Sequence, residues 1–130
     1  MNNKTLAIIK PDSVDKKNVG KIIDRILSAG FIVVAMEQKQ LSKSNAQEFY
    51  EIHRERPFYE DLVSFMTSGP CVPIVLEKNN AVAAFRKIIG STNPEQADLG
   101  TIRKDFAENV QNNAIHGSDS DENARKEIAF

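Results

Sequence analysis

Short apolar runs alternate along this chain with stretches of helical periodicity. Four runs rich in β-branched or small apolar residues predict strands, and they lie at 5–10 (TLAIIK), 31–41 (FIVVAMEQKQL), 72–77 (VPIVLE) and 113–117 (NAIHG). Pro11 and Asp12 end the first run, because this pair favours a turn. Pro73 lies inside the third run, where it fits a strand start or a sheet edge.

Between and after these runs, apolar residues recur every three or four positions, as they do on one face of a helix. The segments with this spacing are 19–30, 42–56, 57–69, 80–90 and 120–130. Gly30 and Gly90 close the first and the fourth, since glycine is common where helices end. The second and third segments follow each other without a strand between them, which predicts a helical hairpin inserted between strands.

The order of these elements predicts an α+β fold. We expect a ferredoxin-like four-stranded antiparallel sheet with helices packed on one face and an inserted helical hairpin. A length of 130 residues fits a single domain, 1–130, with its own hydrophobic core. Residues 91–112 show weak periodicity, and an irregular segment of that length in a compact domain is usually functional.

Composition excludes several classes of protein. A net charge of -1 argues against a general binder of polyanions, so we expect no nucleic-acid partner. The one cysteine, Cys71, has no partner for an intramolecular disulfide and fits a buried thiol in a reducing compartment. No segment approaches the roughly 20 apolar residues of a membrane span, and the N-terminus lacks the apolar core of a signal peptide. We therefore expect a cytoplasmic protein without a membrane partner.

Candidate phosphate-binding groups are cationic side chains. The chain contains neither the GxxxxGK[ST] loop nor a kinase-type glycine-rich loop, so backbone cradles for phosphate are missing. Lys10, Arg86 and Arg103 are the candidates, and a bidentate guanidinium suits phosphate oxygens. For each of them, composition alone favours a solvated surface charge.

The segment NAIHGSDS at 113–120 contains one of the two histidines. An imidazole at a strand end can have one nitrogen free for attack and the other held by an acceptor, although a lone histidine is more often structural. Gly117 permits close approach of the backbone to a phosphate, and Ser118 can donate near the ring. Asp119 either assists a magnesium shell through water or caps the last helix. His53 fits a structural residue or the rim of a site.

Six short motifs, in order along the chain, resemble nucleoside diphosphate kinases. They are IIKPD at 8–12, RPF at 56–58, SGP at 68–70, TNP at 92–94, GTIR at 100–103 and NAIHGSDS at 113–120. The resemblance covers nearly the whole chain. It implies an α/β sandwich that moves the γ-phosphate of a nucleoside triphosphate to a nucleoside diphosphate. The reaction it implies is ping-pong, through a phosphohistidine on His116.

The resemblance also assigns residues. Its catalytic set is His116, Lys10, Tyr50, Glu127 and Ser118. Tyr50 would hydrogen-bond near His116, and Glu127 would accept from the nitrogen of His116 that does not react. The nucleotide-binding set is Lys10, Phe58, Leu62, Arg86, Thr92, Arg103, Val110, Asn113 and Gly117. Phe58 and Val110 would enclose the base, although Phe58 fits a core residue at a helix start equally well.

Cofactor and partners follow from the same resemblance. Mg²⁺ would arrive on the substrate's phosphates, with no metal site made by protein groups alone. Relatives form homo-oligomers built from dimers, and most continue for about ten or more residues beyond the position of Phe130. The dimer is expected to survive that difference, whereas tetramer or hexamer contacts are less secure. The alternative function is a ferredoxin-like nucleotide-sensing or nucleic-acid-binding module without catalysis.

Overall fold

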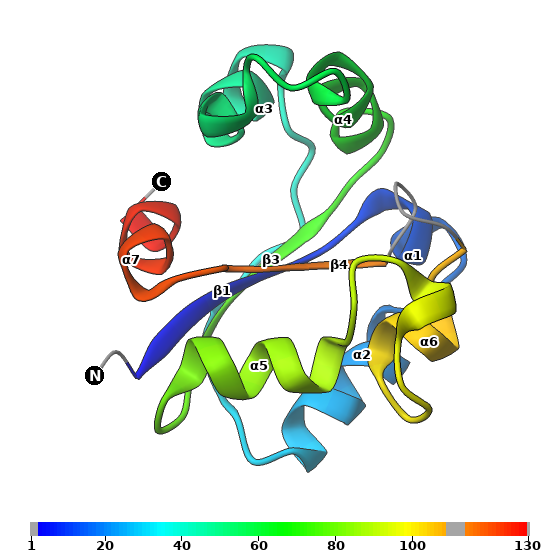
Figure 1. Ribbon diagram of the computed structural model, residues 1–130, viewed down its shortest axis with the longest axis vertical. Coiled ribbons are helices and arrows are strands. Elements are labelled where there is room, and N and C mark those ends of the chain that lie inside the picture. Colours follow the sequence, from blue (N-terminus) through cyan, green and yellow to red (C-terminus); the bar gives the residue numbers. More distant parts are fainter. Residues whose placement is uncertain (1–2, 109–113, 130) are drawn as a thin grey trace.

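The computed structural model describes residues 3–108 and 114–129, and its centre is one four-stranded antiparallel sheet (Figure 1). The strands are β1 (Lys4–Ile9), β2 (Ile32–Met36), β3 (Val72–Glu77) and β4 (Ile115–Gly117). Their order across the sheet is β2-β3-β1-β4, and every neighbouring pair is antiparallel. The predicted sheet is therefore confirmed, with the strand from 31–41 shortened to its first half.

The helices lie where the periodicity predicts them, with two additions. They are α1 (Pro11–Asp15), α2 (Val19–Ser28), α3 (Lys43–Phe49), α4 (Tyr59–Met66), α5 (Ala81–Ile89), α6 (Ile102–Phe106) and α7 (Asp121–Ala129), with short 3₁₀ turns at Glu51–His53 and Pro94–Gln96. Helices α1 and α6 have five residues each, too few to show a period. Within the described residues, no helix is long and apolar enough to cross a membrane.

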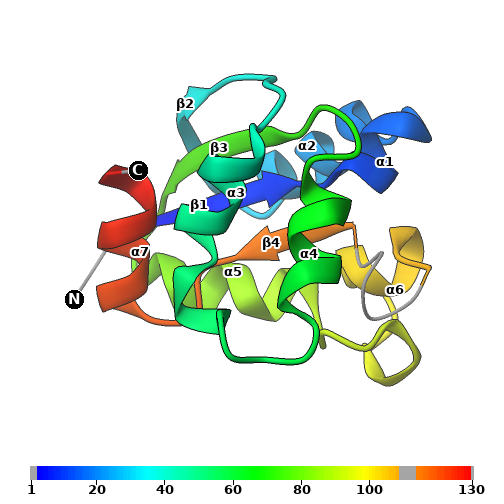
Figure 2. The ribbon, with the colours of Figure 1, turned by 90° about the horizontal axis from the view of Figure 1, so that it is seen from above.

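The helices cover both faces of the sheet, so the prediction of helices on one face is wrong. Helices α3, α4 and α7 lie over one face, and α2, α5 and α6 lie over the other (Figures 1 and 2). Strand β1 shows the cause, because Leu6 and Ile8 belong to one buried cluster while Ala7 and Ile9 belong to the other. A strand that is apolar at every position must be covered on both sides.

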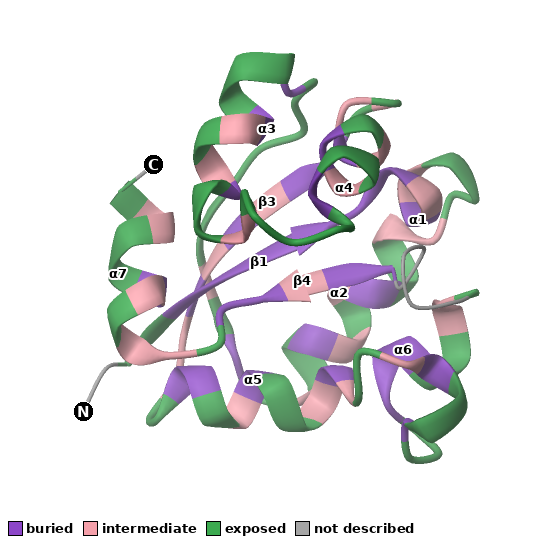
Figure 3. Cartoon of the chain, turned by 45° about the horizontal axis from the view of Figure 1, so that its top comes forward, coloured by how far each residue is buried: buried purple, intermediate pink, exposed green. Residues whose placement is uncertain are grey.

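Burial concentrates on the two strands that carry the site. Strands β1 and β4 are buried for most of their length (Figure 3), whereas β2 is exposed at the edge. Of the two alternatives for Pro73, the strand start is confirmed and the sheet edge is wrong, since β3 is an interior strand and Pro73 is its second residue. Its carbonyl accepts from the N–H of Glu37, just beyond the last residue of β2, where the ladder between these strands ends.

Gly117 ends β4 in a tight contact with α5. A Cβ at this position would lie 2.9 Å from Ile89 Cδ1 and 3.0 Å from Phe85 Cδ2, and both side chains are fully buried. Glycine is therefore needed here for packing beneath the sheet, a reason different from the approach to phosphate that the sequence suggests.

We predict that Gly117→Ala lowers the free energy of unfolding by about 1–3 kcal/mol, because close-packed cores resist an added carbon. Urea denaturation would show this as a lower midpoint with an unchanged slope. Gly20→Ala is the matched control, since Gly20 lies in the first turn of α2, a Cβ there meets nothing within 4 Å, and alanine suits a helix better than glycine. Equal midpoints for Gly117→Ala and the wild type would refute the packing argument.

Candidate active site

His116 is the middle residue of β4 and pairs with Ile8 of β1. Its Nε2 lies 2.8 Å from Oε1 of Glu127 on α7, and the Ser118 hydroxyl donates to the same oxygen at 2.7 Å. A carboxylate accepts here from two donors, which places the imidazole proton on Nε2. Nδ1 then has its lone pair available for attack.

Two aromatic rings hold the imidazole in place. Phe49, the last residue of α3, and Tyr50 meet the His116 ring edge to face, with centroids 5.6 and 6.3 Å away. The Tyr50 hydroxyl is buried and has no hydrogen-bond partner in the described part of the chain, so here Tyr50 contacts His116 through its ring. Burial, with the nearby Glu127 charge, raises the pKa of Tyr50, which keeps this phenol neutral.

Three cations converge on the same site. Lys10 follows β1, Arg86 comes from the last turn of α5, and Arg103 comes from α6. Arg103 donates to the carbonyls of Ile115 at 2.8 Å and Gly90 at 3.1 Å, which ties α6 to the strand that carries His116. Arg86 donates to the Gly117 carbonyl at 3.5 Å.

Burial and like charge disfavour the charged forms of two of these cations, which favours an anionic ligand. Burial, and then the Arg103 charge, lowers the pKa of Lys10 to about 8. Burial, and then Arg86, lowers the pKa of Arg103 to about 10. A group whose charged form is disfavoured by desolvation and like charge gains most when an anion binds beside it. The site is therefore arranged for an anion that several cations can share.

His116 and these cations open into a pocket of about 620 Å³, a size within the range of small-molecule sites. Phe58 is 47% exposed at its wall, and the His53 ring lies 5.5 Å from the Phe58 ring. Phe58 is thus available for stacking and is no core residue. His53 lines the pocket, as the rim interpretation predicts, and burial lowers its pKa.

The structure gathers most of the predicted site residues around this pocket. Its lining includes Lys10, Tyr50, Phe58, Leu62, Arg86, Thr92, Arg103, His116, Gly117, Asp119 and Glu127. Ser118 is not part of the lining, but its hydroxyl donates to Glu127, which is. Val110 and Asn113 lie outside the described residues. Sequence reasoning missed Phe49 and Ile52, which also line the pocket, because an apolar residue in an amphipathic helical segment is indistinguishable from core.

Asp119 lies at the pocket wall and does not cap α7. Ser120 has that role, since its hydroxyl accepts from the N–H of Asn123 at 3.1 Å. The Asp119 carboxylate accepts from the Asn123 side chain at 2.6 Å. Among the described residues, no three His, Cys, Asp or Glu side chains group together as a metal site.

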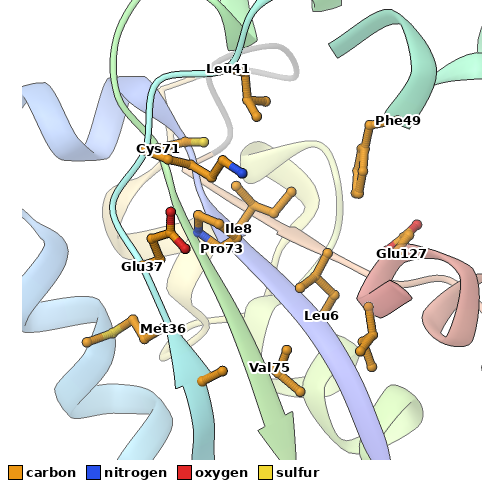
Figure 4. Close-up of a pocket in the computed structure, with 13 residues that line it drawn as sticks. Leu6, Ile8, Met36, Glu37, Leu41, Phe49, Cys71, Pro73, Val75 and Glu127 are labelled. Carbon is orange, nitrogen blue, oxygen red and sulfur yellow. The ribbon is translucent and has the colours of Figure 1, made fainter. Parts of the chain in front are cut away.

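A second, smaller pocket lies behind Glu127, between α7, α3 and the sheet. Its volume is about 270 Å³, and its wall is mainly apolar, with Leu6, Ile8 and Val75 below it (Figure 4). Phe49 and Glu127 line both pockets and so separate them. Cys71 also lines this second pocket and is buried, as predicted.

The site and fold match one family along the chain. The model of the family described as "Nucleoside diphosphate kinase" matches residues 3–130. The nucleoside diphosphate kinase of a Nitratiruptor species is 59% identical over 98% of this chain and 93% of that protein. That of Helicobacter pylori (strain Shi470) is 58% identical over 100% of this chain and 95% of that protein.

Solved structures agree with the sequence relatives. The Aquifex aeolicus nucleoside diphosphate kinase superposes with a TM-score of 0.97 at 45% identity, over 98% of this chain and 93% of that one. The enzyme of Encephalitozoon cuniculi gives a TM-score of 0.94 at 35% identity, over 98% of this chain and 86% of that one. The chain belongs to the nucleoside diphosphate kinase family.

Proposed function

We propose that this chain carries out the nucleoside diphosphate kinase reaction by a ping-pong mechanism, through a phosphohistidine on His116. The observation that carries the proposal is the hydrogen bond from His116 Nε2 to Glu127, which leaves Nδ1 as the basic nitrogen beside three cations. A nucleotide-sensing or nucleic-acid-binding module would need the cations and the aromatic wall. It would have no use for an imidazole oriented by a carboxylate.

In the first half-reaction, the lone pair of Nδ1 attacks the γ-phosphorus of a nucleoside triphosphate. The bond from phosphorus to the bridging oxygen breaks, and the nucleoside diphosphate leaves with that electron pair. The ring gains positive charge as the N–P bond forms, and Glu127 stabilises it through the Nε2–H. The second half-reaction reverses these steps, with a terminal oxygen of another nucleoside diphosphate attacking the phosphohistidine.

Side chains supply the charge that holds the phosphates. Lys10, Arg86 and Arg103 come from three separate elements, so together they position a phosphate chain in line with Nδ1. Thr92 adds a hydroxyl at the pocket wall. Phe58 stacks on the base, and stacking accepts every base because each has a π-face. The roles of Val110 at the base and Asn113 at the sugar rest on the resemblance alone.

Mg²⁺ fits this site as an ion that the substrate brings. One carboxylate, Asp119, faces the pocket beside Glu127, whose oxygen Oε1 already accepts from His116 and Ser118. A single carboxylate besides Glu127 suits an ion that keeps several waters and is held mainly by phosphate oxygens. When bound, the ion would neutralise charge on the transferring phosphoryl group, with Asp119 reaching it through water.

A cytoplasmic location agrees with the proposed chemistry. Cys71 is a free, buried thiol, and burial raises its pKa, so it resists oxidation. Nucleoside di- and triphosphates are the partners that the site requires, and these are intracellular metabolites.

The nucleophile can be tested by labelling. Incubation with γ-labelled ATP and no acceptor should leave label on the wild-type protein, labile in acid and stable in base, as expected of a phosphoramidate. His116→Ala should abolish both labelling and transfer while nucleotide binding, measured by calorimetry, persists because the cations and Phe58 remain. His53→Ala is the matched control, since it removes the only other histidine and should keep the label. Label that survives in His116→Ala would rule out this nucleophile.

The exposed edge of the sheet favours a second copy of this chain as a protein partner. Strand β2 is at the edge of the sheet, with one side of its backbone unpaired by the described strands. Ile32, Val34 and Met36 are 60%, 48% and 51% exposed on it, and Leu27 on neighbouring α2 is 50% exposed. An exposed apolar edge invites another strand, and two copies related by a two-fold axis would pair β2 with β2.

A lysine on this edge should break the dimer, because the pairing would bury its charge. We expect Val34→Lys to sediment with the mass of one chain, 14.5 kDa, at concentrations where the wild type is a dimer. Leu99→Lys changes an apolar side chain that is 88% exposed and lies outside β2, so it should remain dimeric. A Val34→Lys protein that keeps the wild-type mass would place the interface elsewhere.

A further inference from the structure

The turn of residues 10–12, where β1 leads into the first residues of α1, binds Ala114, the residue just before β4. The N–H of Lys10 donates to the Ala114 carbonyl at 2.9 Å. In return, the N–H of Ala114 donates to Oδ2 of Asp12 at 3.2 Å. Both backbone polar groups of Ala114 therefore bind the same turn, two residues before His116.

Ala114 needs such support because of its backbone. Its φ is +73°, in the left-handed region that an alanine rarely adopts, and the residue is fully buried. A conformation of this kind persists only where surrounding contacts hold it. The Asp12 carboxylate supplies the contact on the N–H side, and the ladder of β4 with β1 begins at the next residue, Ile115.

Asp12 also acts on Lys10 through its charge. Burial raises the pKa of Asp12, while Lys10 and the N–H groups of Ser13 and Ala114 oppose that change. Conversely, Asp12 opposes the burial and the Arg103 charge that lower the pKa of Lys10 to about 8. Lys10 thus keeps its proton near neutral pH partly because Asp12 faces it.

The charges that act on Lys10 are those of Arg103 on α6 and Asp12 on α1. The pocket that Lys10 lines also contains other titratable or charged groups, which are Tyr50 after α3, His53 on the 3₁₀ turn, Arg86 on α5, His116 on β4, Asp119 before α7 and Glu127 on α7. Glu127 is already engaged by His116 and Ser118. Asp12 is the carboxylate of this set that is adjacent in sequence to the Lys10 turn and is itself partly buried.

We propose that Asp12 is a positioning residue for phosphoryl transfer, an inference that rests on the function proposed above. Its carboxylate fixes Ala114, and through it the strand of His116, against the Lys10 turn. Its negative charge keeps the Lys10 ammonium protonated beside the phosphate. Together, the two effects position His116 and Lys10 relative to each other, although Asp12 and Ala114 are 102 residues apart in the chain.

The test separates the hydrogen bond from the charge. Asp12→Asn keeps an oxygen that can accept from Ala114 but removes the charge, and Asp12→Ala removes both. The readout is kcat/KM for ATP across pH, which reports ionisations of the free enzyme. Since Lys10 must be protonated, the wild type loses kcat/KM as pH rises through the Lys10 pKa. Without the Asp12 charge, that loss begins at lower pH.

We expect the ratio of Asp12→Asn to wild type to fall by roughly threefold to tenfold between about pH 7 and about pH 9. Asp12→Ala should lose about tenfold in kcat already at pH 7, because β4 is no longer fixed. Asp15→Asn is the matched control, as it removes the same charge from an exposed position on the same short helix, and its pH profile should follow the wild type.

Thermal unfolding of each variant checks that the protein remains folded. If Asp12→Ala does not fold, the profile of Asp12→Asn decides the proposal, because that variant retains an acceptor for Ala114. An Asp12→Asn profile that parallels the wild type overturns the effect of the Asp12 charge on Lys10. A folded Asp12→Ala variant with the kcat of the wild type at pH 7 overturns the effect of its hydrogen bond to Ala114. A wild-type protein without transfer activity would instead overturn the proposed function, so the two failures are distinct.

Discussion

The hydrogen bond between His116 Nε2 and Glu127 determines what the pocket can do. Without an acceptor at 2.8 Å, the ring could rotate and its proton could lie on either nitrogen, so the imidazole could present either nitrogen to a substrate. With it, Nδ1 is the nitrogen left to react, and the developing positive charge has a partner. Ser118 donates to the same oxygen, and Ile128, beside Glu127 on α7, packs against the buried cluster on that face.

This bond depends on a sheet that is covered on both faces. Strand β4 carries His116 toward α3 and α7, while Gly117, next in the chain, lies against α5 on the other face. Arg103 ties α6 to β4, and the β1–α1 turn holds Ala114 at the start of that strand. His116 is therefore held by Glu127 on α7, and its strand is held by Arg103 on α6 and by pairing with β1. Phosphoryl transfer depends on such positioning, because a poorly aligned nucleophile loses most of its advantage.

Local pattern was sufficient for the sheet and for most helices, but it could not give the contacts between distant segments. The apolar run at 5–10 has buried residues on both faces, and its lack of alternation could have indicated this. Helices α1 and α6 are too short for periodicity to reveal. Asp12 and Ala114 meet across 102 positions, so their contact does not follow from local pattern. The cap of α7 is local, but Asp119 and Ser120 are adjacent and both residue types suit an N-cap, so the sequence does not distinguish them. The motif-bearing residues of the site were predictable because the family resemblance carried them.

The nitrogen of His116 that carries the phosphate shows directly whether Glu127 holds Nε2 during the reaction. After labelling with ATP, the phosphoenzyme can be digested in alkali, and the two phosphohistidine isomers can be distinguished by ³¹P NMR against standards. Because Glu127 holds Nε2, we predict phosphate on Nδ1 of His116. Phosphate on Nε2 would contradict it, since that nitrogen could react only if its bond to Glu127 were absent in the working enzyme.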